Sequence, residues 1–193
     1  MLNEVLENTE RFMSSVPKAK RKKYGQFFTN ATTAKFMASL FCFDLSKKQV
    51  DILDAGAGTG ILAAAVVQKL LESGYGGAIH ITCYETDELV LPLLEENMIL
   101  CNKLHNVSYT IKRENYITSQ NFSGYTLFNN ENYQYDYIIG NPPYMKIAKD
   151  AAEALAIPEV CYGAPNLYFL FWAMGIHNLK EEQELVYIIP RSW

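Results

Sequence analysis

The sequence predicts an α/β fold with an open, mostly parallel sheet and helices on both of its faces. From residue 50 onward, short β-type apolar runs alternate with helical segments, which is typical of parallel sheets with right-handed crossovers. Residues 61–72 are apolar almost all round, as expected of a helix packed on a sheet. Two segments interrupt the apolar texture, 54–60 and 141–144, and each follows a predicted strand. Ligands bind at the carboxyl ends of such strands, so we expect the functional site there.

The composition is that of an ordinary globular protein. The chain has 193 residues, of which 49% are hydrophobic and 20% charged, values that disfavour disordered, collagen-like and coiled-coil proteins. The length suits one domain, and we expect a helical segment at 1–45 to form one compact unit with a catalytic core at 46–193. The sequence contains neither an apolar run of about 18 residues nor a signal-peptide pattern, so we expect a cytoplasmic protein that does not contact membranes.

Cysteine spacing and charge narrow the function classes further. The four cysteines lie far apart without a C-x-x-C pair, which predicts reduced thiols and no metal site or disulfide framework. The net charge is −4, yet residues 1–30 hold six Lys or Arg against three Glu. This basic segment suits contact with nucleic-acid phosphates, and it suits a solvated flank equally well.

The first half of the chain contains the following predicted elements. Leu2, Val5, Leu6 and Met13 have close to helical spacing, so we expect a helix over 2–15, followed by a linker that extends to Lys23. Either Thr29 or Asn30 can cap the next helix, which we expect to end near Asp44. A strand at 50–55, the helix at 61–72 and a second strand at 78–85 follow.

The second half continues the alternation. We expect a helix over 87–103 with Pro92 in its first turn, then a strand at 107–112. Residues 118–134 are rich in Asn, Ser and Gly and predict a long, functional loop. A strand at 135–140, a helix at 166–179 and a fifth strand at 185–189 complete the predicted elements.

A glycine-rich loop follows the first strand of this core. Gly56, Gly58 and Gly60 allow a tight turn that brings amide groups and a helix N-terminus against an anionic ligand group. A dinucleotide-binding loop has the spacing G-x-G-x-x-G, and Ile61 occupies the last of those positions, which disfavours a nicotinamide cofactor. Glu85, at the end of the second strand, is placed to accept hydrogen bonds from two ribose hydroxyls. The alternative interpretations are a plain glycine turn and a surface glutamate.

The tetrapeptide Asn141-Pro142-Pro143-Tyr144 is the most specific signal in the chain. Its prolines stiffen the loop and have no amide donors, so the loop offers acceptors and an aromatic ring. The Asn141 side-chain oxygen and the Pro142 carbonyl can accept hydrogen bonds from one planar amino group, and Tyr144 can stack on a flat substrate. An ordinary proline turn would explain the prolines alone.

A third motif, Tyr24-Gly25-Gln26-Phe27-Phe28-Thr29, precedes these two. With the three motifs in this order, the chain resembles the S-adenosylmethionine-dependent methyltransferases that modify DNA adenine N6, in the γ arrangement found in restriction–modification systems. The resemblance extends over residues 20–193 and includes Asn166-Leu167-Tyr168 and the strand 186–190. It implies a Rossmann-like methyltransferase fold, with the last strands and a target-recognition region expected beyond Trp193.

The resemblance also implies how S-adenosylmethionine is bound. Asp54 and the three loop glycines would surround the methionine part of the cofactor, Phe27 and Thr29 would close over it, and Glu85 would hold the ribose. Family members usually have an apolar residue and an Asp-Phe pair against the adenine. The matching residues here are Thr86 and the pair Asn115-Tyr116.

For catalysis, the resemblance implies that Asn141 and the Pro142 carbonyl favour a pyramidal amino nitrogen, which attacks the methyl group directly. Tyr144 would stack on an adenine flipped out of duplex DNA. The expected partners are DNA and a restriction endonuclease or fused nuclease domain. A cytosine-C5 enzyme would need a cysteine after a proline, which the chain lacks. Protein-glutamine N5 methylation, RNA guanine-N2 methylation and a binding module without turnover are the alternatives.

Overall fold

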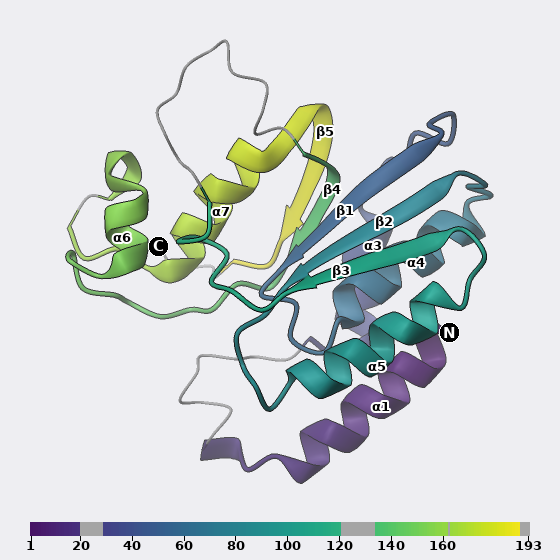
Figure 1. Ribbon diagram of the computed structural model, residues 1–193, viewed down its shortest axis with the longest axis horizontal. Coiled ribbons are helices and arrows are strands. Elements are labelled where there is room, and N and C mark those ends of the chain that lie inside the picture. The colour runs from purple at the N-terminus through teal and green to yellow at the C-terminus, as the bar shows by residue number, and fades with distance from the viewer. Residues whose placement is uncertain (20–28, 121–133, 162, 190–193) are drawn as a thin grey trace.

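Five parallel strands form one sheet in the order β3-β2-β1-β4-β5 (Figure 1). The computed structural model describes residues 1–19, 29–120, 134–161 and 163–189. The strands are β1 (Gln49–Ala55), β2 (Ala78–Tyr84), β3 (Val107–Lys112), β4 (Tyr135–Gly140) and β5 (Leu179–Tyr187). This arrangement confirms the predicted α/β fold with a parallel sheet.

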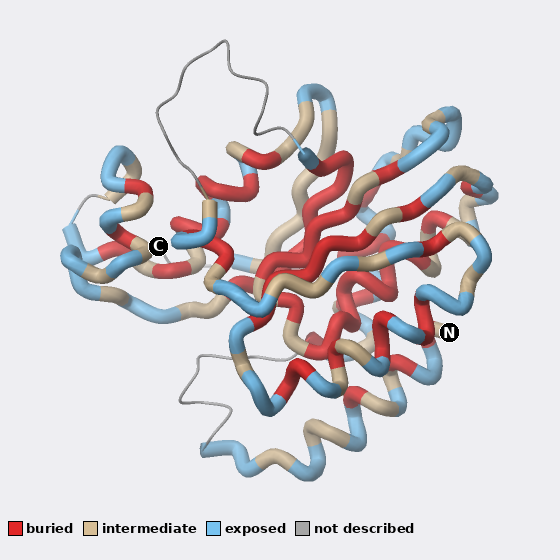
Figure 2. Tube along the Cα trace, viewed as in Figure 1, coloured by how far each residue is buried: buried red, intermediate tan, exposed pale blue. Residues whose placement is uncertain are grey.

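Helices cover both faces of the sheet. One face carries α1 (Leu2–Ser15), α3 (Ala31–Ser39), α4 (Ile61–Glu72) and α5 (Leu91–Asn102). The other carries α7 (Leu167–Asn178) with the short α6 (Ala152–Ala156) and a 3₁₀ turn, Pro158–Val160, beside it. Neighbouring strand residues alternate between the two cores, so Ile52 packs with α4 whereas Leu53 packs with α7. The inner strands β1, β2 and β4 are mostly buried, whereas the edge strands β3 and β5 are partly exposed (Figure 2).

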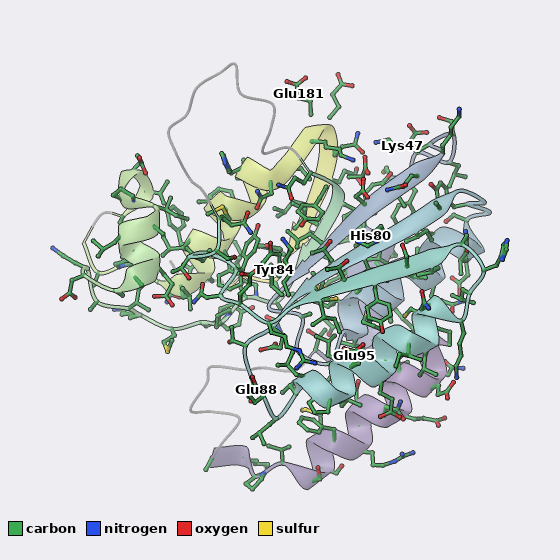
Figure 3. The ribbon with its side chains drawn as sticks, viewed as in Figure 1. Lys47, His80, Tyr84, Glu88, Glu95 and Glu181 are labelled. Carbon is green, nitrogen blue, oxygen red and sulfur yellow. The ribbon has the colours of Figure 1, made fainter. Side chains whose placement is uncertain are left out.

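The strand order reverses between β1 and β4, which are neighbours in the sheet although β2 and β3 separate them in sequence. Their pairing places Asp54 opposite Ile139. The segments after the two strands therefore emerge side by side at the carboxyl edge, the position where open α/β sheets bind ligands. Tyr84 marks this edge in Figure 3, and Lys47 lies at the opposite end of the strands.

Two helices differ from their predicted limits. The second helix ends at Ser39 and not near Asp44, because the Phe41 and Phe43 rings leave the helix and pack on Tyr137, with centroids 5.5 and 5.0 Å away. Asn30 caps this helix, accepting a hydrogen bond from the amide of Thr33 at 2.9 Å. The helix predicted from residue 87 begins at Leu91, because residues 87–90 form a turn in which the Asp87 carbonyl accepts from the Val90 amide.

The second half holds further differences. The fifth strand begins at Leu179, six residues before the prediction, and ends at Tyr187. Its first residues, from Lys180 to Glu184, are mostly charged and carry no apolar signal, and Glu182 has a φ of 58° beside a register irregularity. α6 and the 3₁₀ turn were not predicted. Most of the predicted 118–134 loop and the 20–23 part of the linker lie outside the described residues.

None of the helices in the described ranges is long and apolar enough to cross a membrane. All four cysteines are free thiols. The helix α1 shares one hydrophobic core with α4 and α5, to which it contributes Leu2 and Val5.

Candidate functional site

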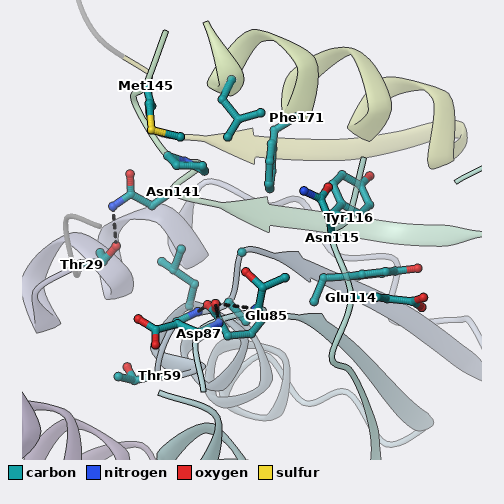
Figure 4. A pocket seen from close by; sticks show the side chains of 18 of the residues that line it. Thr29, Thr59, Glu85, Asp87, Glu114, Asn115, Tyr116, Asn141, Met145 and Phe171 are labelled. Carbon is teal, nitrogen blue, oxygen red and sulfur yellow. Dashed lines mark hydrogen bonds between the residues drawn. The ribbon is translucent and has the colours of Figure 1, made fainter. Parts of the chain in front are cut away.

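A cavity of about 330 Å³ opens at the carboxyl edge of the sheet, where the elements after β1, β2, β3 and β4 meet (Figure 4). Its walls include an acidic side and an apolar side. The lining residues are Thr29, Gly56, Ala57, Gly58, Thr59, Ile61, Leu62, Tyr84, Glu85, Thr86, Asp87, Glu114, Asn115, Tyr116, Asn141, Pro143, Met145, Glu153, Leu167 and Phe171.

The glycine-rich loop forms one wall of this cavity. Gly56, Gly58 and Gly60 all have positive φ, between 55° and 77°, which is the left-handed region that glycine enters without strain. The amides of Gly56 and Ala57 both donate to the Tyr84 carbonyl at 2.9 Å, which ties the loop to the end of β2. A Cβ on Gly60 would lie 2.6 Å from the Met98 Cε, so a side chain there would also have to displace the end of Met98.

Asp54 lies behind the loop and does not line the cavity. Gly60, the N-cap of α4, has no side chain, and the Asp54 Oδ2 takes over the capping role by accepting from the Ala63 amide at 3.0 Å. Burial raises the pKa of the Asp54 carboxyl to about 8, and the nearby negative charge of Glu85 adds to the increase. Among the described residues, no group hydrogen-bonds to the Asp54 Oδ1.

Glu85 connects the glycine-rich loop to the end of β2. Its Oε2 accepts from the Gly58 amide at 2.8 Å, and its Oε1 accepts from the amides of Thr86 and Asp87 at 2.7 and 2.8 Å. The residue is only 7% exposed, and that exposed part faces the cavity, which Thr86 also lines. A carboxylate offers about four lone-pair positions, so roughly one remains for a ligand hydroxyl.

Asn115 uses its side chain locally. Its Oδ1 accepts from the amides of Ile117 and Thr118 at 2.9 and 3.2 Å, which occupies both lone pairs of that oxygen. Its Nδ2 donates to the Glu153 Oε1 at 2.8 Å, and this bond holds the glutamate of α6 at the cavity wall. Asn115 therefore acts on the cavity indirectly, because it holds the carboxylate of Glu153 at the cavity wall.

The apolar wall is aromatic. The Tyr116 ring packs between Tyr84 and Phe171, with centroids 5.1 and 5.4 Å away. Its hydroxyl donates to the Asn178 Oδ1 at 2.7 Å, so the polar end of Tyr116 is satisfied away from the cavity. Phe171 comes from α7 and points into the cavity (Figure 4).

Both ends of the Asn141 side-chain amide are held. Its Nδ2 donates to the Thr29 Oγ1 at 3.2 Å, and its Oδ1 accepts from the Tyr144 hydroxyl at 2.6 Å. That hydroxyl also lies 2.8 Å from the Ile188 carbonyl. Burial raises the pKa of Tyr144 to about 12, so the phenol stays protonated and acts as a donor at neutral pH.

The start of α7 anchors the loop that follows Asn141. The Leu167 amide donates to the Met145 carbonyl at 2.8 Å, and the Tyr168 ring meets Tyr144 edge-on at 6.1 Å. Asn166 caps α7 through the Tyr168 amide. The short segment 166–168 thus holds the tetrapeptide loop in place against the sheet.

Most of the predicted site residues surround one cavity. Those that line it are Thr29, Gly56, Gly58, Glu85, Thr86, Asn115, Tyr116 and Asn141. Those outside its lining are Asp54, Gly60, Pro142 and Tyr144, and Phe27 lies outside the described residues.

Sequence reasoning missed several lining residues. The most informative are Asp87, Glu114, Glu153 and Phe171. Asp87 and Glu114 directly follow predicted strands, and that position was a signal for both. Nothing local marked Glu153 or Phe171, because only the packing of α6 and α7 brings them to this edge.

The sequence of residues 32–193 matches the profile of the Eco57I restriction-modification methylase family. The chain belongs to this family. The match includes the glycine-rich loop, Glu85 and the Asn141–Tyr144 tetrapeptide.

Related proteins agree with this family assignment. The chain is 35% identical to the Type II methyltransferase M.PstI of Providencia stuartii over 184 residues, which cover 93% of the chain and 36% of that protein. It is 33% identical to a release factor glutamine methyltransferase of Fusobacterium nucleatum over 146 residues, which cover 75% of the chain and 35% of that protein. The chain therefore spans about a third of the length of these relatives.

A solved structure shows the same fold. The crystal structure of a type I restriction-modification methyltransferase subunit from Streptococcus thermophilus superimposes with a TM-score of 0.63 at 19% identity, covering 86% of this chain and 34% of that one. The described part of the chain therefore has a Rossmann-like methyltransferase fold.

Proposed function

We propose that the chain is the catalytic region of a DNA methyltransferase that transfers a methyl group from S-adenosylmethionine to adenine N6. The observation that carries the proposal is Asn141, whose amide is held by Thr29 and Tyr144 at the wall of the Glu85 cavity. A fixed acceptor for an amino group thus lies in the same cavity as a carboxylate suited to a ribose. The family of the chain supports the link to restriction–modification.

The charge of the cavity fits S-adenosylmethionine. Within the described residues, four carboxylates line it, those of Glu85, Asp87, Glu114 and Glu153, and no Lys or Arg does. S-adenosylmethionine carries a net positive charge, whereas a dinucleotide carries a diphosphate that such a wall would repel. The glycine-rich loop adds backbone amides at the N-terminus of α4, where the methionine carboxylate would bind.

Each part of the cofactor has a candidate partner. Glu85 has an acceptor position for a ribose hydroxyl, and Phe171 with Tyr116 offers an aromatic wall. The adenine amino group needs an acceptor, which the occupied Asn115 Oδ1 no longer provides. We therefore assign that contact to the Glu153 carboxylate, which Asn115 holds in place.

S-adenosylmethionine, when bound, supplies an electrophilic methyl group. The residues of the chain prepare the nucleophile, because the lone pair of an adenine amino group is delocalised into the ring. Hydrogen bonds that the two N–H groups of this amine donate to the Asn141 Oδ1 and the Pro142 carbonyl favour a pyramidal nitrogen with an available lone pair. Since a carbonyl oxygen accepts two hydrogen bonds, the Tyr144 hydroxyl can orient Asn141 while Asn141 also binds the amino group.

The substrate must leave the duplex to reach this position. A base inside the stack is inaccessible, so the target adenine is flipped out beside Asn141, and the ring of Tyr144, outside the cavity lining, is the proposed stacking surface. DNA is thus the proposed partner, with a restriction endonuclease or a fused nuclease domain as its functional counterpart. A protein that acts on genomic DNA in a bacterial cell works in the cytoplasm, so we propose that location.

Glutamine methylation is the second candidate. A glutamine side-chain amide is also a planar amino group, and the release factor glutamine methyltransferase aligns with 75% of the chain. The Type II methyltransferase aligns with 93%, which favours DNA.

The deciding experiment follows radiolabelled methyl transfer by the natural protein, with any sequence that flanks these residues. We expect label in N6-methyladenine after digestion of duplex DNA, and a loss of several orders of magnitude in Asn141→Ala with nearly unchanged cofactor affinity. Label in glutamine of a release factor would transfer the assignment to the second candidate. A near-normal rate in Asn141→Ala would refute the role of the tetrapeptide.

A further inference from the structure

A polar cluster connects α1 to the glycine-rich loop. The Thr9 hydroxyl donates to the Thr59 Oγ1 at 3.0 Å. Asn97 of α5 donates from Nδ2 to the Thr59 carbonyl at 2.8 Å and accepts from Asn8 at 3.1 Å through its Oδ1. Thr59 lines the cavity (Figure 4), so α1 and α5 both form hydrogen bonds to a residue of the cavity wall.

The position of Thr9 on its helix indicates that the contact with Thr59 is part of the packing of α1 on the loop. The buried side of α1 consists of Leu2, Val5 and Thr9. Thr9 is 3% exposed and is the polar member of this otherwise apolar stripe, at the point where the helix passes the loop. Its partners are equally buried, with Thr59 1% and Asn97 0% exposed. Buried polar groups with satisfied hydrogen bonds favour one arrangement of the groups that they join.

The loop needs such support in its second half. Its first half is tied to the sheet through the Tyr84 carbonyl, and its centre to Glu85 through the Gly58 amide. Beyond Gly58 the backbone passes through Thr59 to Gly60, a glycine with a φ of 77°. Glycine restricts the backbone least, so the tertiary contacts of Thr59 add to the bond from the Gly60 amide to the Ala57 carbonyl in holding this part of the loop.

We infer that Thr9 is a positioning residue for the cofactor, and that α1 clamps the glycine-rich loop in its binding conformation through Thr59. The inference rests on the proposed S-adenosylmethionine site. Without the clamp, cofactor binding must also order the second half of the loop, and that ordering reduces affinity. The chemistry of methyl transfer stays unchanged, because Thr9 does not line the cavity itself and its hydroxyl bonds to Thr59 and not to Asn141.

The test compares three variants of α1 by calorimetry with S-adenosylmethionine and by amide hydrogen exchange of Gly60, whose amide donates to the Ala57 carbonyl. Thr9→Val keeps the volume but removes the hydroxyl, so we expect an increase of about three- to tenfold in Kd, the effect of one lost hydrogen bond. Exchange at Gly60 should accelerate by a similar factor. Thr9→Ser keeps the hydroxyl and should match the wild type in both measurements.

Val5→Ala is the matched control, because Val5 is fully buried on the same helix and its side chain cannot hydrogen-bond to Thr59. It should lower the melting temperature and leave both the Kd and the Gly60 exchange unchanged. If Val5→Ala and Thr9→Val changed the Kd and the Gly60 exchange rate equally, the cause would be a general loss of stability. If Thr9→Val had the wild-type Kd and exchange rate, Thr9 would not hold the loop. Either result overturns the inference. A wild-type protein that does not bind S-adenosylmethionine would refute the proposed cofactor, and exchange alone would then decide whether Thr9 holds the loop.

Discussion

Replacement of Glu85 by Gln tests the proposed contact of this side chain with the ribose, and a second variant controls for the loss of its charge. The side chain is almost fully buried, and three backbone amides already occupy its oxygens at 2.7–2.8 Å. One lone-pair position is left for a ribose hydroxyl, so the structure supports one strong hydrogen bond without rearrangement, whereas the sequence suggested two. In the variant, one oxygen becomes an NH₂ group that can no longer accept from Gly58 or from the ligand.

A hydrogen bond to a charged group is worth about 1.5–3 kcal/mol. Loss of that bond predicts a dissociation constant about ten- to a hundredfold higher in Glu85→Gln. Calorimetry with S-adenosylmethionine measures the effect directly, and circular dichroism confirms that the variant is folded. Repeating the titration with an analogue that lacks both ribose hydroxyls isolates the contact, because the difference between wild type and variant that remains comes from the lost Gly58 bond and should be smaller.

Glu88→Gln is the control for charge. Glu88 lies three residues further along, removes the same charge when replaced, and does not line the cavity (Figure 3). Its variant should bind the cofactor as the wild type does, apart from a small effect on long-range attraction. Unchanged affinity in Glu85→Gln, or equal losses in both variants, would refute the assignment of Glu85 to the ribose.

Further predictions concern three other side chains. If Tyr144 acts by stacking, worth about 1–3 kcal/mol per base, the rate of methyl transfer to DNA should fall roughly tenfold or more in Tyr144→Ala. In Tyr144→Phe the rate should fall by a smaller factor of about threefold to tenfold, because this variant loses only the hydrogen bond that orients Asn141. Equal losses in the two variants would show that the hydroxyl alone matters. Because the folded pKa of Asp54 is about 8, above its ordinary value of 3.8, its contribution to stability is complete below about pH 4 and is lost as the pH rises toward 8. Urea unfolding of the cofactor-free chain should therefore show a decline on the order of 1 kcal/mol per pH unit in that window that Asp54→Asn lacks, and identical slopes would contradict the buried, protonated carboxyl. Glu153→Ala should weaken S-adenosylmethionine binding about three- to tenfold and leave the affinity for an analogue without the adenine amino group unchanged, whereas Glu159→Ala, outside the cavity lining, should bind both ligands normally.

The identity of the elements was accessible from the sequence because it depends on local patterns. Apolar runs bounded by turn residues predicted all five strands, and the caps at Asn30 and Asn166 are local side-chain contacts. The placement of the glycine-rich loop and the tetrapeptide at the carboxyl ends of strands was also predicted, whereas the pairing of β1 with β4 comes from the tertiary structure.

The partners within the site depended on tertiary structure. Asn115 was expected to bind the cofactor, yet its oxygen accepts from the turn that it closes, and α6 brings Glu153 to the position that we propose for this contact. Asp54 was expected beside the ligand, but the absence of a side chain on Gly60 makes it the cap of α4.

The sequence by itself thus determined the order of strands and helices, the chemical type of each motif and the edge of the sheet where the motifs gather. Only the tertiary structure decided which atoms remain available to a ligand and which residues far away in sequence support the loop, as Thr9 supports Thr59. The physical reason is that periodicity and turn chemistry act over a few neighbouring residues, whereas the occupancy of a lone pair depends on every group that packs against it.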